Sequence, residues 1–387
     1  MKNLYERNII LHYVISALMW GRFFVPVMAL FYIASEVSLA EFTIIMSVFS
    51  LTILLLEIPS GAITDMLGKK NALLVSRFFY ILEIFLIAFF NGFWTFLIAK
   101  IISGVGVSLS SGSNSAFLFD TLKKLKRQKE YKKTQGITVA IQKTAMALVF
   151  ITGAFLFTIH YKLPAIASLP FLTLGFLLTF FLKEPFKYKK VISMKNYFFQ
   201  MKTGLKKFYS NYNLKYLALF TFIVGSSIAM MLNLSSKYFE LVLIPIALIG
   251  LISFLMNLTS AITAKKANYL EQKLGRKSSI ILSTTLILIA VLLSALLIPY
   301  ISVLFFFIIA LVQGFYEVII SDYINQESKT DTRATMLSIN NMFSNIGIFL
   351  IFPLLGIIQD QISFASSLVF LSILILVALL VLIIKYK

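Results

Sequence analysis

The sequence is dominated by apolar runs that recur at the length needed to cross a bilayer. A helix needs about 20 residues to cross a hydrocarbon core of about 30 Å, and it satisfies its own backbone there. With 59% hydrophobic residues, 13% charged residues and a mean hydropathy of +0.91, the chain has too little polar surface to coat a water-soluble globule. The sequence therefore predicts an all-α membrane protein.

The apolar runs between polar breaks predict twelve transmembrane helices. The predicted spans are 8–33, 38–60, 71–91, 94–119, 136–159, 163–182, 214–236, 243–264, 278–298, 300–323, 334–357 and 362–384. We expect two six-helix bundles, residues 1–182 and 214–387, separated by a cytoplasmic central loop over 183–213. This loop mixes basic and aromatic residues, so it is either a tether or an amphipathic segment on anionic headgroups.

An internal repeat indicates that the two bundles are pseudo-symmetric. Gly68-Lys69-Lys70 follows the second span, and Gly275-Arg276-Lys277 follows the eighth span 207 residues later. The same offset carries the start of the first span onto the start of the seventh. Two related helical halves that meet at a midplane site are a known plan of secondary transporters.

The basic residues predict the orientation of the chain. Most of the 35 lysines and arginines lie at the two ends or in the loops after even-numbered spans, and only Lys162 and Lys237 lie on the other face. Cytoplasmic loops retain Lys and Arg during insertion, so both termini are predicted to be cytoplasmic. This placement accounts for the net charge of +19 without nucleic acid. Together with a retained first span, it predicts a multi-pass protein of a bacterial cytoplasmic membrane.

The sequence contains no motif of a membrane enzyme. Cysteine is absent, His12 and His160 lie near opposite faces, and there is no HExxH motif, nucleophile elbow or P-loop. We therefore expect no metal, cofactor or catalytic residue. A transferase-type membrane enzyme and a non-transporting sensor or scaffold remain the rival classes.

The loop between the second and third spans resembles the signature of the major facilitator superfamily, G-x-x-x-D-x-x-G-R/K-K/R. The matching residues are Gly61, Asp65, Gly68, Lys69 and Lys70, with Arg77 as the expected partner of Asp65. The resemblance implies a transporter in which this loop latches the two halves on the cytoplasmic side. The corresponding stretch 264–268 has no acidic residue, which predicts a weaker or differently made latch in the second half.

Three further stretches bear on the same resemblance. Glu57–Gly61 and Arg333–Ser338 resemble a bacterial branch of the superfamily. Lys100–Gly106 in the fourth span is similar to the pattern R-x-x-x-G-x-G, with Lys in place of an Arg that the resemblance links to proton transfer. The fifth span lacks the Gly-Pro motif of drug/proton antiporters around Gly153, which disfavours that interpretation.

Charged side chains inside the spans are the main site candidates, because each costs about 2.5–3.5 kcal/mol at mid-bilayer. The resemblance implies that spans one, four, seven and ten line a central cavity, which places Arg22, Lys100 and Glu317 there. Arg22 either binds a carboxylate or phosphate of the substrate or pairs with Glu57 or Glu317. Glu317 shares a helix face with Gln313 and either couples protons or forms a structural salt bridge.

The other candidates have a structural alternative each. Glu57 is the second proton-coupling candidate and also a possible partner of Lys143, and Glu83 is expected to be structural. Asp120 and Asp322 are expected to gate or to pair with Arg333. Neutral groups predicted to line the cavity, or to serve in helix packing, are Asn114, Tyr316 and Asn341.

The sequence therefore predicts a monomeric secondary transporter that moves a small solute by alternating access. Proton-coupled efflux of an amphipathic compound, such as a drug, is favoured by spans rich in aromatic residues, since the chain has 38 Phe and 17 Tyr. Transport of a polar anionic solute, by uptake or export, is the alternative that Arg22 and Lys100 favour.

Overall fold

The computed structural model describes residues 2–186, 202–206, 208–328 and 333–385, and it omits the side chains at positions 2, 3, 58, 333, 334 and 385. Within these ranges the chain is mostly helical and contains no strand. Eleven helices in the described part are long and apolar enough to cross a membrane. Each corresponds to one of the predicted spans from the second to the twelfth, so the multi-pass α-helical class is confirmed.

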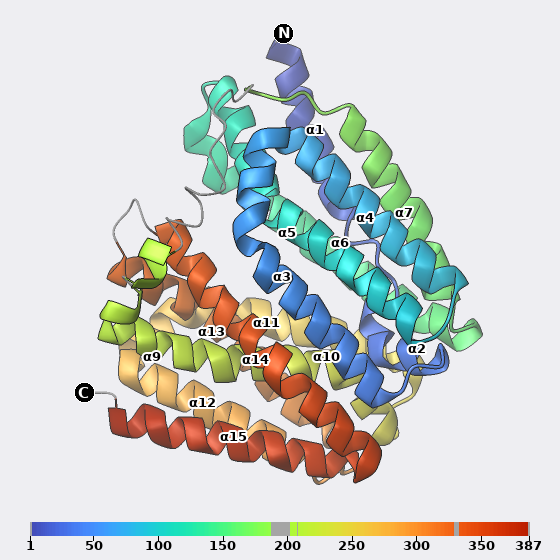
Figure 1. Ribbon diagram of the computed structural model, residues 1–387, viewed down its shortest axis with the longest axis vertical. Coiled ribbons are helices and arrows are strands. Elements are labelled where there is room, and N and C mark those ends of the chain that lie inside the picture. Colours follow the sequence, from blue (N-terminus) through green and yellow to red (C-terminus); the bar gives the residue numbers. More distant parts are fainter. Residues whose placement is uncertain (1, 187–201, 207, 329–332, 386–387) are drawn as a thin grey trace. The chain divides into compact units, whose positions relative to one another are not determined.

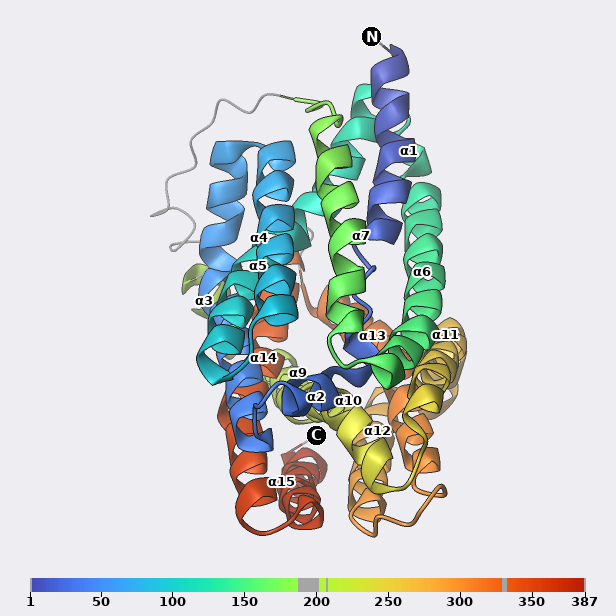
Figure 2. The ribbon, with the colours of Figure 1, turned by 90° about the vertical axis from the view of Figure 1, so that its right-hand side faces the viewer.

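One compact unit comprises residues 1–26 and 55–199. Its helices are α1 (Lys2–Leu18), α4 (Lys69–Phe89), α5 (Phe93–Lys124), α6 (Tyr131–Ile159) and α7 (Leu163–Phe180), with a short 3-10 turn η2 (Gln128–Glu130) before α6. Within this unit α4 packs against α5 and α7, and α1 packs against α6 and α7 (Figures 1 and 2). Gly92 turns α4 into α5 with a φ of 90°, a conformation that other residues rarely adopt.

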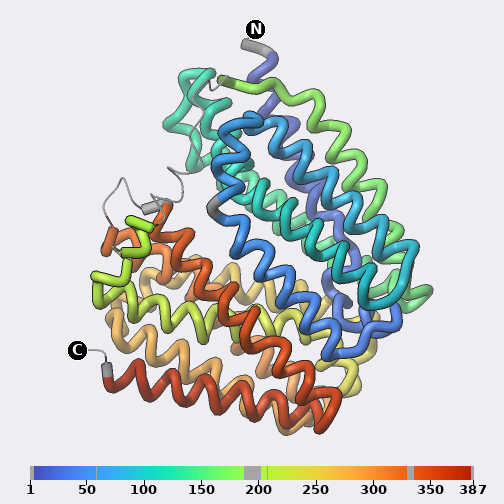
Figure 3. The backbone as a smooth tube through the Cα atoms, in the orientation of Figure 1, coloured from blue at the N-terminus to red at the C-terminus, as the bar shows by residue number. Residues whose placement is uncertain are grey.

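The second compact unit comprises residues 27–54 and 200–387. Its helices are α2 (Met28–Ala34), α9 (Tyr212–Phe220), the π-helix η3 (Thr221–Gly225), α10 (Ser226–Leu241), α11 (Ile246–Leu274), α12 (Arg276–Ser294), α13 (Val303–Glu327), α14 (Arg333–Gln361) and α15 (Phe364–Lys385). Figure 3 shows α12 and α15 lying side by side. Helix α3 (Leu39–Leu67) contributes its first part to this unit and its remainder to the other. The bundle boundaries 1–182 and 214–387 stay a prediction.

The predicted continuous first span over 8–33 is wrong, because the helix is interrupted. Helix α1 ends at Leu18, and residues 19–24 are non-helical before the short turn η1 (Val25–Val27) and α2 (Figure 2). Pro26 has no N–H to donate and restricts the residue before it, so a regular helix is not continued there. The freed backbone is satisfied by other contacts, since the Phe23 N–H donates to Ser168 Oγ at 3.0 Å.

Tight packing holds the interruption in place within the first unit. A Cβ on Gly153 of α6 would lie 1.9 Å from the Phe23 carbonyl oxygen, and a Cβ on Gly21 would lie 2.5 Å from Phe171 on α7. Only glycine fits at such distances, because a methyl group would overlap its neighbour. Residues around the break are therefore held by a close backbone approach that the apolar pattern does not reveal.

Candidate functional site

A cluster of charged side chains lies inside the first unit. The carboxylate of Glu83 on α4 is fully buried and accepts a hydrogen bond of 2.8 Å from Lys100 Nζ on α5. Ser103, also on α5, donates to the second oxygen of Glu83 at 2.7 Å. Arg22 Nη2, in the break of the first span, lies 3.1 Å from the same oxygen. Three separate elements therefore bring two cations to one carboxylate.

An aromatic ring positions the Arg22 guanidinium. Its carbon lies 4.3 Å from the centroid of the Tyr80 ring, a cation–π contact. The Tyr80 hydroxyl is hydrogen-bonded to Ser110 Oγ at 2.8 Å. A Cβ on Gly106 would lie 3.0 Å from that ring, so glycine lets α5 approach it closely. The Lys100–Gly106 motif thus supplies both a counterion for Glu83 and room for the ring that supports Arg22.

The cluster carries one positive charge in excess. Arg22 and Lys100 both pair with Glu83, and an arginine stays protonated in proteins. Arg22 Nη2 is buried and makes no hydrogen bond of good geometry, although its ion pair with Glu83 is close. The Arg22 side chain is 18% exposed, whereas that of Glu83 is 0% exposed. The excess charge therefore lies at the one member of the three with partial access.

The structure corrects the predicted counterion of Arg22. Glu57 and Glu317 were the partners named in the ion-pair alternative for Arg22, but the carboxylate in contact is Glu83, for which a structural role was favoured. A sequence signal for part of this site exists. Glu83 and Lys100 lie at nearly equal distances on either side of the turn at Gly92, so an antiparallel helix pair brings them to the same depth.

The candidates on α13 lie in the second unit. Gln313 Nε2 donates to Glu317 Oε1 at 3.0 Å, which confirms that the two share a helix face. The Glu317 side chain is exposed, not buried as a proton-coupling role was expected to require. Tyr316 packs against Phe220 of α9, with ring centroids 5.5 Å apart and ring planes tilted by 58°.

The remaining polar candidates are dispersed over other helices. Asn114 is half-buried on α5, and Asn341 on α14 is exposed, with its carbonyl 3.4 Å from Asn345 Nδ2. Glu57 is half-buried on α3, and Lys143 is exposed on α6. Nowhere among the described residues do three His, Cys, Asp or Glu side chains form a group that could hold a metal. The roles predicted for these four side chains stay predictions.

The signature loop of the first unit is joined to two other elements. Gly68 has a φ of 83° and precedes α4, and the Lys69 ammonium forms an ion pair with Asp120 at the end of α5. Asp120 was expected to pair with Arg333, whose side chain lies outside the described residues. Glu184, after α7, accepts a hydrogen bond of 2.7 Å from the Lys70 N–H at the start of α4.

Glu184 is a residue that sequence analysis missed. Burial raises the pKa of its carboxyl above the usual range, and the backbone N–H groups of Lys70 and Lys69 oppose this shift. The Lys70 side chain donates to the Phe180 carbonyl at 2.7 Å. The end of α7 and the chain that follows it are thus bound to the signature loop.

Arg77, Gly61 and Asp322 are the remaining candidates for the cytoplasmic gate predicted from the sequence. Arg77 is buried and donates to Thr179 on α7. Its pairing with the half-buried Asp65 stays a prediction. Gly61 lies within α3, and Asp322 on α13 accepts a hydrogen bond of 2.7 Å from Gln326.

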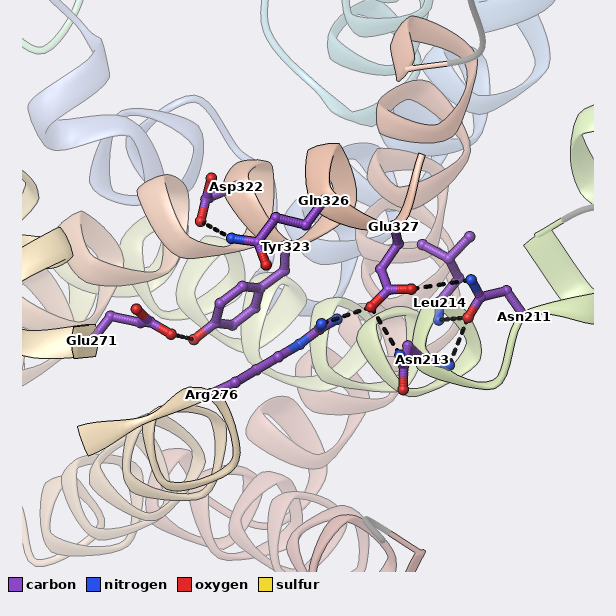
Figure 4. A network of polar contacts seen from close by, with 9 residues as sticks. All are labelled: Asn211, Asn213, Leu214, Glu271, Arg276, Asp322, Tyr323, Gln326 and Glu327. Atoms are coloured by element: carbon purple, nitrogen blue, oxygen red, sulfur yellow. Dashed lines mark hydrogen bonds and ion pairs between the residues drawn. The ribbon is translucent and has the colours of Figure 1, made fainter. Parts of the chain in front are cut away.

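A matching network lies at the corresponding place in the second unit (Figure 4). Arg276 Nη1 at the start of α12 lies 2.7 Å from Glu327 Oε1 at the end of α13. Glu327 also accepts from Asn211 at 3.1 Å and from Asn213 at 2.8 Å. The sequence predicted a weaker or differently made latch here because 264–268 lacks an acidic residue. The carboxylate of this pair comes from the end of α13, as Asp120 comes from the end of α5, so the predicted difference between the two latches stays a prediction.

Tyr323 extends this network to α11. Its hydroxyl donates to Glu271 at 2.9 Å, and the Arg276 guanidinium lies 4.7 Å from the centroid of its ring (Figure 4). Arg276 and Glu327 follow Lys69 and Asp120 by the same 207 residues that separate the two Gly-basic-basic turns. The two units therefore carry the same ion pair at equivalent positions of the repeat.

Comparisons with known proteins agree with the sequence resemblance. A family model described as Major Facilitator Superfamily matches residues 9–268 and 238–387. No curated protein sequence matches the chain. Among solved structures, the nucleoside transporter NupG has a TM-score of 0.79 and 12% identity, with 100% of both chains covered.

Two other solved structures are similar over nearly the whole chain. A POT family transporter in complex with a thioalcohol-conjugated peptide has a TM-score of 0.70 and 13% identity, covering 98% of this chain and 95% of that one. A bacterial homologue of the human lysosomal transporter Spinster, inward-facing and unoccupied, has a TM-score of 0.74 and 13% identity, covering 100% and 97%. At identities this low, the structural similarity establishes a shared fold and nothing further.

Proposed function

Because the chain belongs to the Major Facilitator Superfamily, we propose that it is a secondary transporter that carries a small solute across a bacterial cytoplasmic membrane by alternating access. In this proposal the interrupted first span counts as one crossing, so that twelve crossings place both termini in the cytoplasm. The moving parts are two six-helix bundles related by the internal repeat. The central loop over 183–213 connects them.

The solute is proposed to be an anion, and the observation that carries this is the excess positive charge at Arg22. Glu83 is already satisfied by Lys100 and Ser103, so it is a weak competitor for the hydrogen-bond donors of the guanidinium. A carboxylate or phosphate can take two parallel N–H bonds from an arginine fork. The Tyr80 ring contacts one face of the guanidinium, which leaves its in-plane N–H groups as the donors for an anion in this proposal.

The electrostatic cost of the Arg22–Glu83–Lys100 cluster supports the same class of solute. A cation in a low-dielectric region is stabilised by water or by a counterion, and one carboxylate serves two cations here. An anion bound at Arg22 would make the cluster neutral. The similar structures include a nucleoside transporter and a transporter bound to a peptide conjugate. At 12–13% identity, these ligands do not indicate the solute of this chain.

A second candidate is proton-coupled export of an amphipathic compound. It is favoured by Glu317, an exposed carboxylate on α13 to which Gln313 donates a hydrogen bond. The two candidates differ in whether transport depends on the charge of the solute or on a pH gradient and Glu317.

Flux into proteoliposomes tests the anionic solute. We would compare matched solutes that differ only in a carboxylate or phosphate group, using the unmodified protein, Arg22→Gln and Arg22→Lys. We expect Arg22→Gln to lower uptake of the anionic members by at least about tenfold, because a charge-assisted contact contributes about 1.5–3 kcal/mol. Arg22→Lys should retain part of the activity, since it keeps the charge and loses the fork.

The control is Lys143→Gln, which removes an exposed positive charge from α6. Its flux should equal that of the unmodified protein. Equal transport of charged and neutral solutes by Arg22→Gln would contradict the anionic assignment. A substrate-dependent proton signal that disappears in Glu317→Gln would favour the second candidate instead.

A further inference from the structure

The turn between α5 and α6 carries a concentration of positive charge that the transport mechanism does not use. Eleven consecutive residues contain seven basic side chains and one acidic side chain, Glu130. We call the basic set the basic platform, and its members are Lys123, Lys124, Lys126, Arg127, Lys129, Lys132 and Lys133.

The basic platform rests on a folded turn. Leu122 is 0% exposed and Leu125 is 8% exposed, so both anchor the turn in the first unit. The Arg127 N–H donates to the Leu122 carbonyl at 2.8 Å, and Lys126 has a φ of 60°. These contacts fix the backbone, so its lysines are presented from a defined surface.

The single carboxylate of the turn is already used. Arg127 Nε and Nη2 donate to the two oxygens of Glu130, each at 2.6 Å, in a bidentate pair. The six lysines of the platform are exposed. They form no ion pair with any carboxylate in the described ranges of the chain. The platform therefore presents about six uncompensated charges to its surroundings.

Aromatic rings border these charges. Phe119 is 41% exposed and lies with its ring centroid 5.5 Å from that of Tyr131. The ammonium groups of Lys123 and Lys124 lie 5.9 and 5.1 Å from the centroid of the Phe186 ring. Aromatic side chains are typical of the boundary between hydrocarbon and headgroups. The platform also lies between two helices of spanning length, where the chain leaves the hydrocarbon.

The second half of the repeat has no equivalent charge density. At the offset of 207 residues the corresponding stretch begins at position 330, and the loop around it contains Lys329, Asp331 and Arg333. Orientation by positive charge needs only a modest excess in short loops, which this second loop illustrates. The basic platform carries more positive charge than orientation in the membrane requires. We therefore expect it to bind a negatively charged partner.

We propose that the basic platform binds the phosphate groups of anionic phospholipids in the leaflet that borders it. Each Lys near an anionic membrane surface contributes about 1 kcal/mol, and the effect falls within a Debye length of about 8 Å at physiological salt. Lipid is the favoured occupant because the platform lies at the membrane boundary and carries interfacial rings. This binding is independent of the solute and of the direction of transport.

The test uses the full chain purified in a mild detergent and titrated with phosphatidylglycerol or phosphatidylethanolamine. The platform variant combines Lys126→Gln, Lys129→Gln, Lys132→Gln and Lys133→Gln, and it leaves the two lysines beside Phe186 unchanged. The control variant removes the same charge from exposed lysines elsewhere, by Lys215→Gln, Lys265→Gln, Lys266→Gln and Lys273→Gln. Bound lipid is counted by native mass spectrometry.

We expect phosphatidylglycerol to bind the unmodified protein and the control variant alike, and to bind the platform variant at least about tenfold more weakly. Phosphatidylethanolamine should not distinguish the three proteins, and added salt should weaken phosphatidylglycerol binding. Equal loss in both variants would overturn the proposal, because it would indicate net charge alone. Tighter binding of a short oligonucleotide or a phosphopeptide to the platform would overturn it in favour of a soluble partner.

Discussion

The two halves of the chain agree at the turns that precede α4 and α12 and differ within their spans. Lys69 pairs with Asp120 in the first unit, and Arg276 pairs with Glu327 at the equivalent positions of the second. In both, a glycine with positive φ starts the third helix of the half. In each half, the ion pair joins the beginning of that helix to the end of the next helix. It therefore connects the open ends of one helical hairpin in each half.

Inside the membrane the repeat positions of the buried charges diverge. Glu83 and Lys100 correspond to Ala290 and Phe307 in the second half. Arg22 corresponds to Ala229 at the same offset. Each buried charge costs several kcal/mol unless it is paired, and the second half omits all three. These charges are not needed for the fold that the two halves share, because the other half forms without them, and this supports the site proposed at Arg22.

The first span of each half is also irregular in a different way. In the first half the helix is broken over residues 19–24, and in the second half α9 continues through the π-helix Thr221–Gly225 into α10. A π-helix keeps its backbone hydrogen bonds within the helix and often occurs at functional sites. The break instead depends on outside partners such as Ser168. We therefore expect the first half to be the more sensitive to substitutions around its irregular segment.

The largest effect is expected from Glu83→Gln, which removes the carboxylate that Arg22 and Lys100 share. Breaking a buried ion pair in this way costs about 3–5 kcal/mol of stability. Lys100→Met should cost less, because it leaves a neutral Arg22–Glu83 pair. Thermal unfolding in detergent, followed by the fluorescence of Trp20 and Trp94, measures the loss of stability in each of the two variants.

The control is the double variant Glu83→Gln/Lys100→Met, which should recover part of the stability lost in Glu83→Gln, because only the partly exposed Arg22 remains charged. An equal loss in Glu83→Gln and Lys100→Met would mean that the excess positive charge has no energetic consequence. The contrast between the two halves would then lose its electrostatic basis.

A second large effect is expected from Gly153→Ala, which sharpens the comparison of the two first spans. Its Cβ would lie 1.9 Å from the Phe23 carbonyl, so the break must move. Overpacking of this kind costs about 1–3 kcal/mol. The matched control is Gly136→Ala on the same helix, where a Cβ meets nothing within 4 Å. That variant should be neutral or stabilised by up to about 1 kcal/mol. Equal melting temperatures for the two variants would contradict the tight approach.

Double-mutant cycles on the Lys69–Asp120 and Arg276–Glu327 ion pairs test their equivalence. Lys69→Met with Asp120→Asn, and Arg276→Met with Glu327→Gln, should each give a coupling free energy of about 1–2 kcal/mol. Both pairs are at most 22% exposed, so solvent screens them only in part. The Arg127–Glu130 pair, at about 41–42% exposure, should couple more weakly. Coupling in one half alone would break the proposed symmetry.

Much of the fold was predictable from the sequence because lipid imposes a simple rule. Each span must satisfy its backbone internally, so an apolar run of the right length predicts a helix, and eleven of the twelve runs form one. The exception at residues 19–24 was not predictable in the same way. Gly21 and Pro26 are tolerated in membrane helices, and the contacts that stabilise the break come from Ser168 and Gly153, far along the chain.

Less of the candidate site was predictable, because ion pairs depend on depth and rotation that the apolar pattern does not specify. Arg22 and Lys100 were identified from the cost of charge in lipid, but Glu83 was not recognised as their common partner. Glu184 and Glu327 lie at helix ends or in a loop, where a carboxylate is ordinary in sequence. Only their three-dimensional contacts distinguish them.

The smallest expected effect concerns Glu184, which follows α7 in the first unit. Burial raises the pKa of this carboxyl, so the folded protein binds its proton more tightly than the unfolded chain does. The contribution of Glu184 to stability is therefore fully present below the ordinary pKa of a glutamate and is lost as the pH rises through the raised value.

It follows that the melting temperature of the unmodified protein, relative to Glu184→Gln, should fall as the pH is raised from acidic to neutral. Glutamine keeps an oxygen that can accept the Lys70 N–H bond and carries no proton to lose. The exposed Glu6→Gln should leave this pH dependence unchanged. An opposite slope would show that the N–H donors of the signature loop outweigh burial. Glu184 would then stabilise the start of α4 as an anion at the positive end of the helix dipole. At the start of α12, the N-cap residue Gly275 makes no side-chain cap hydrogen bond.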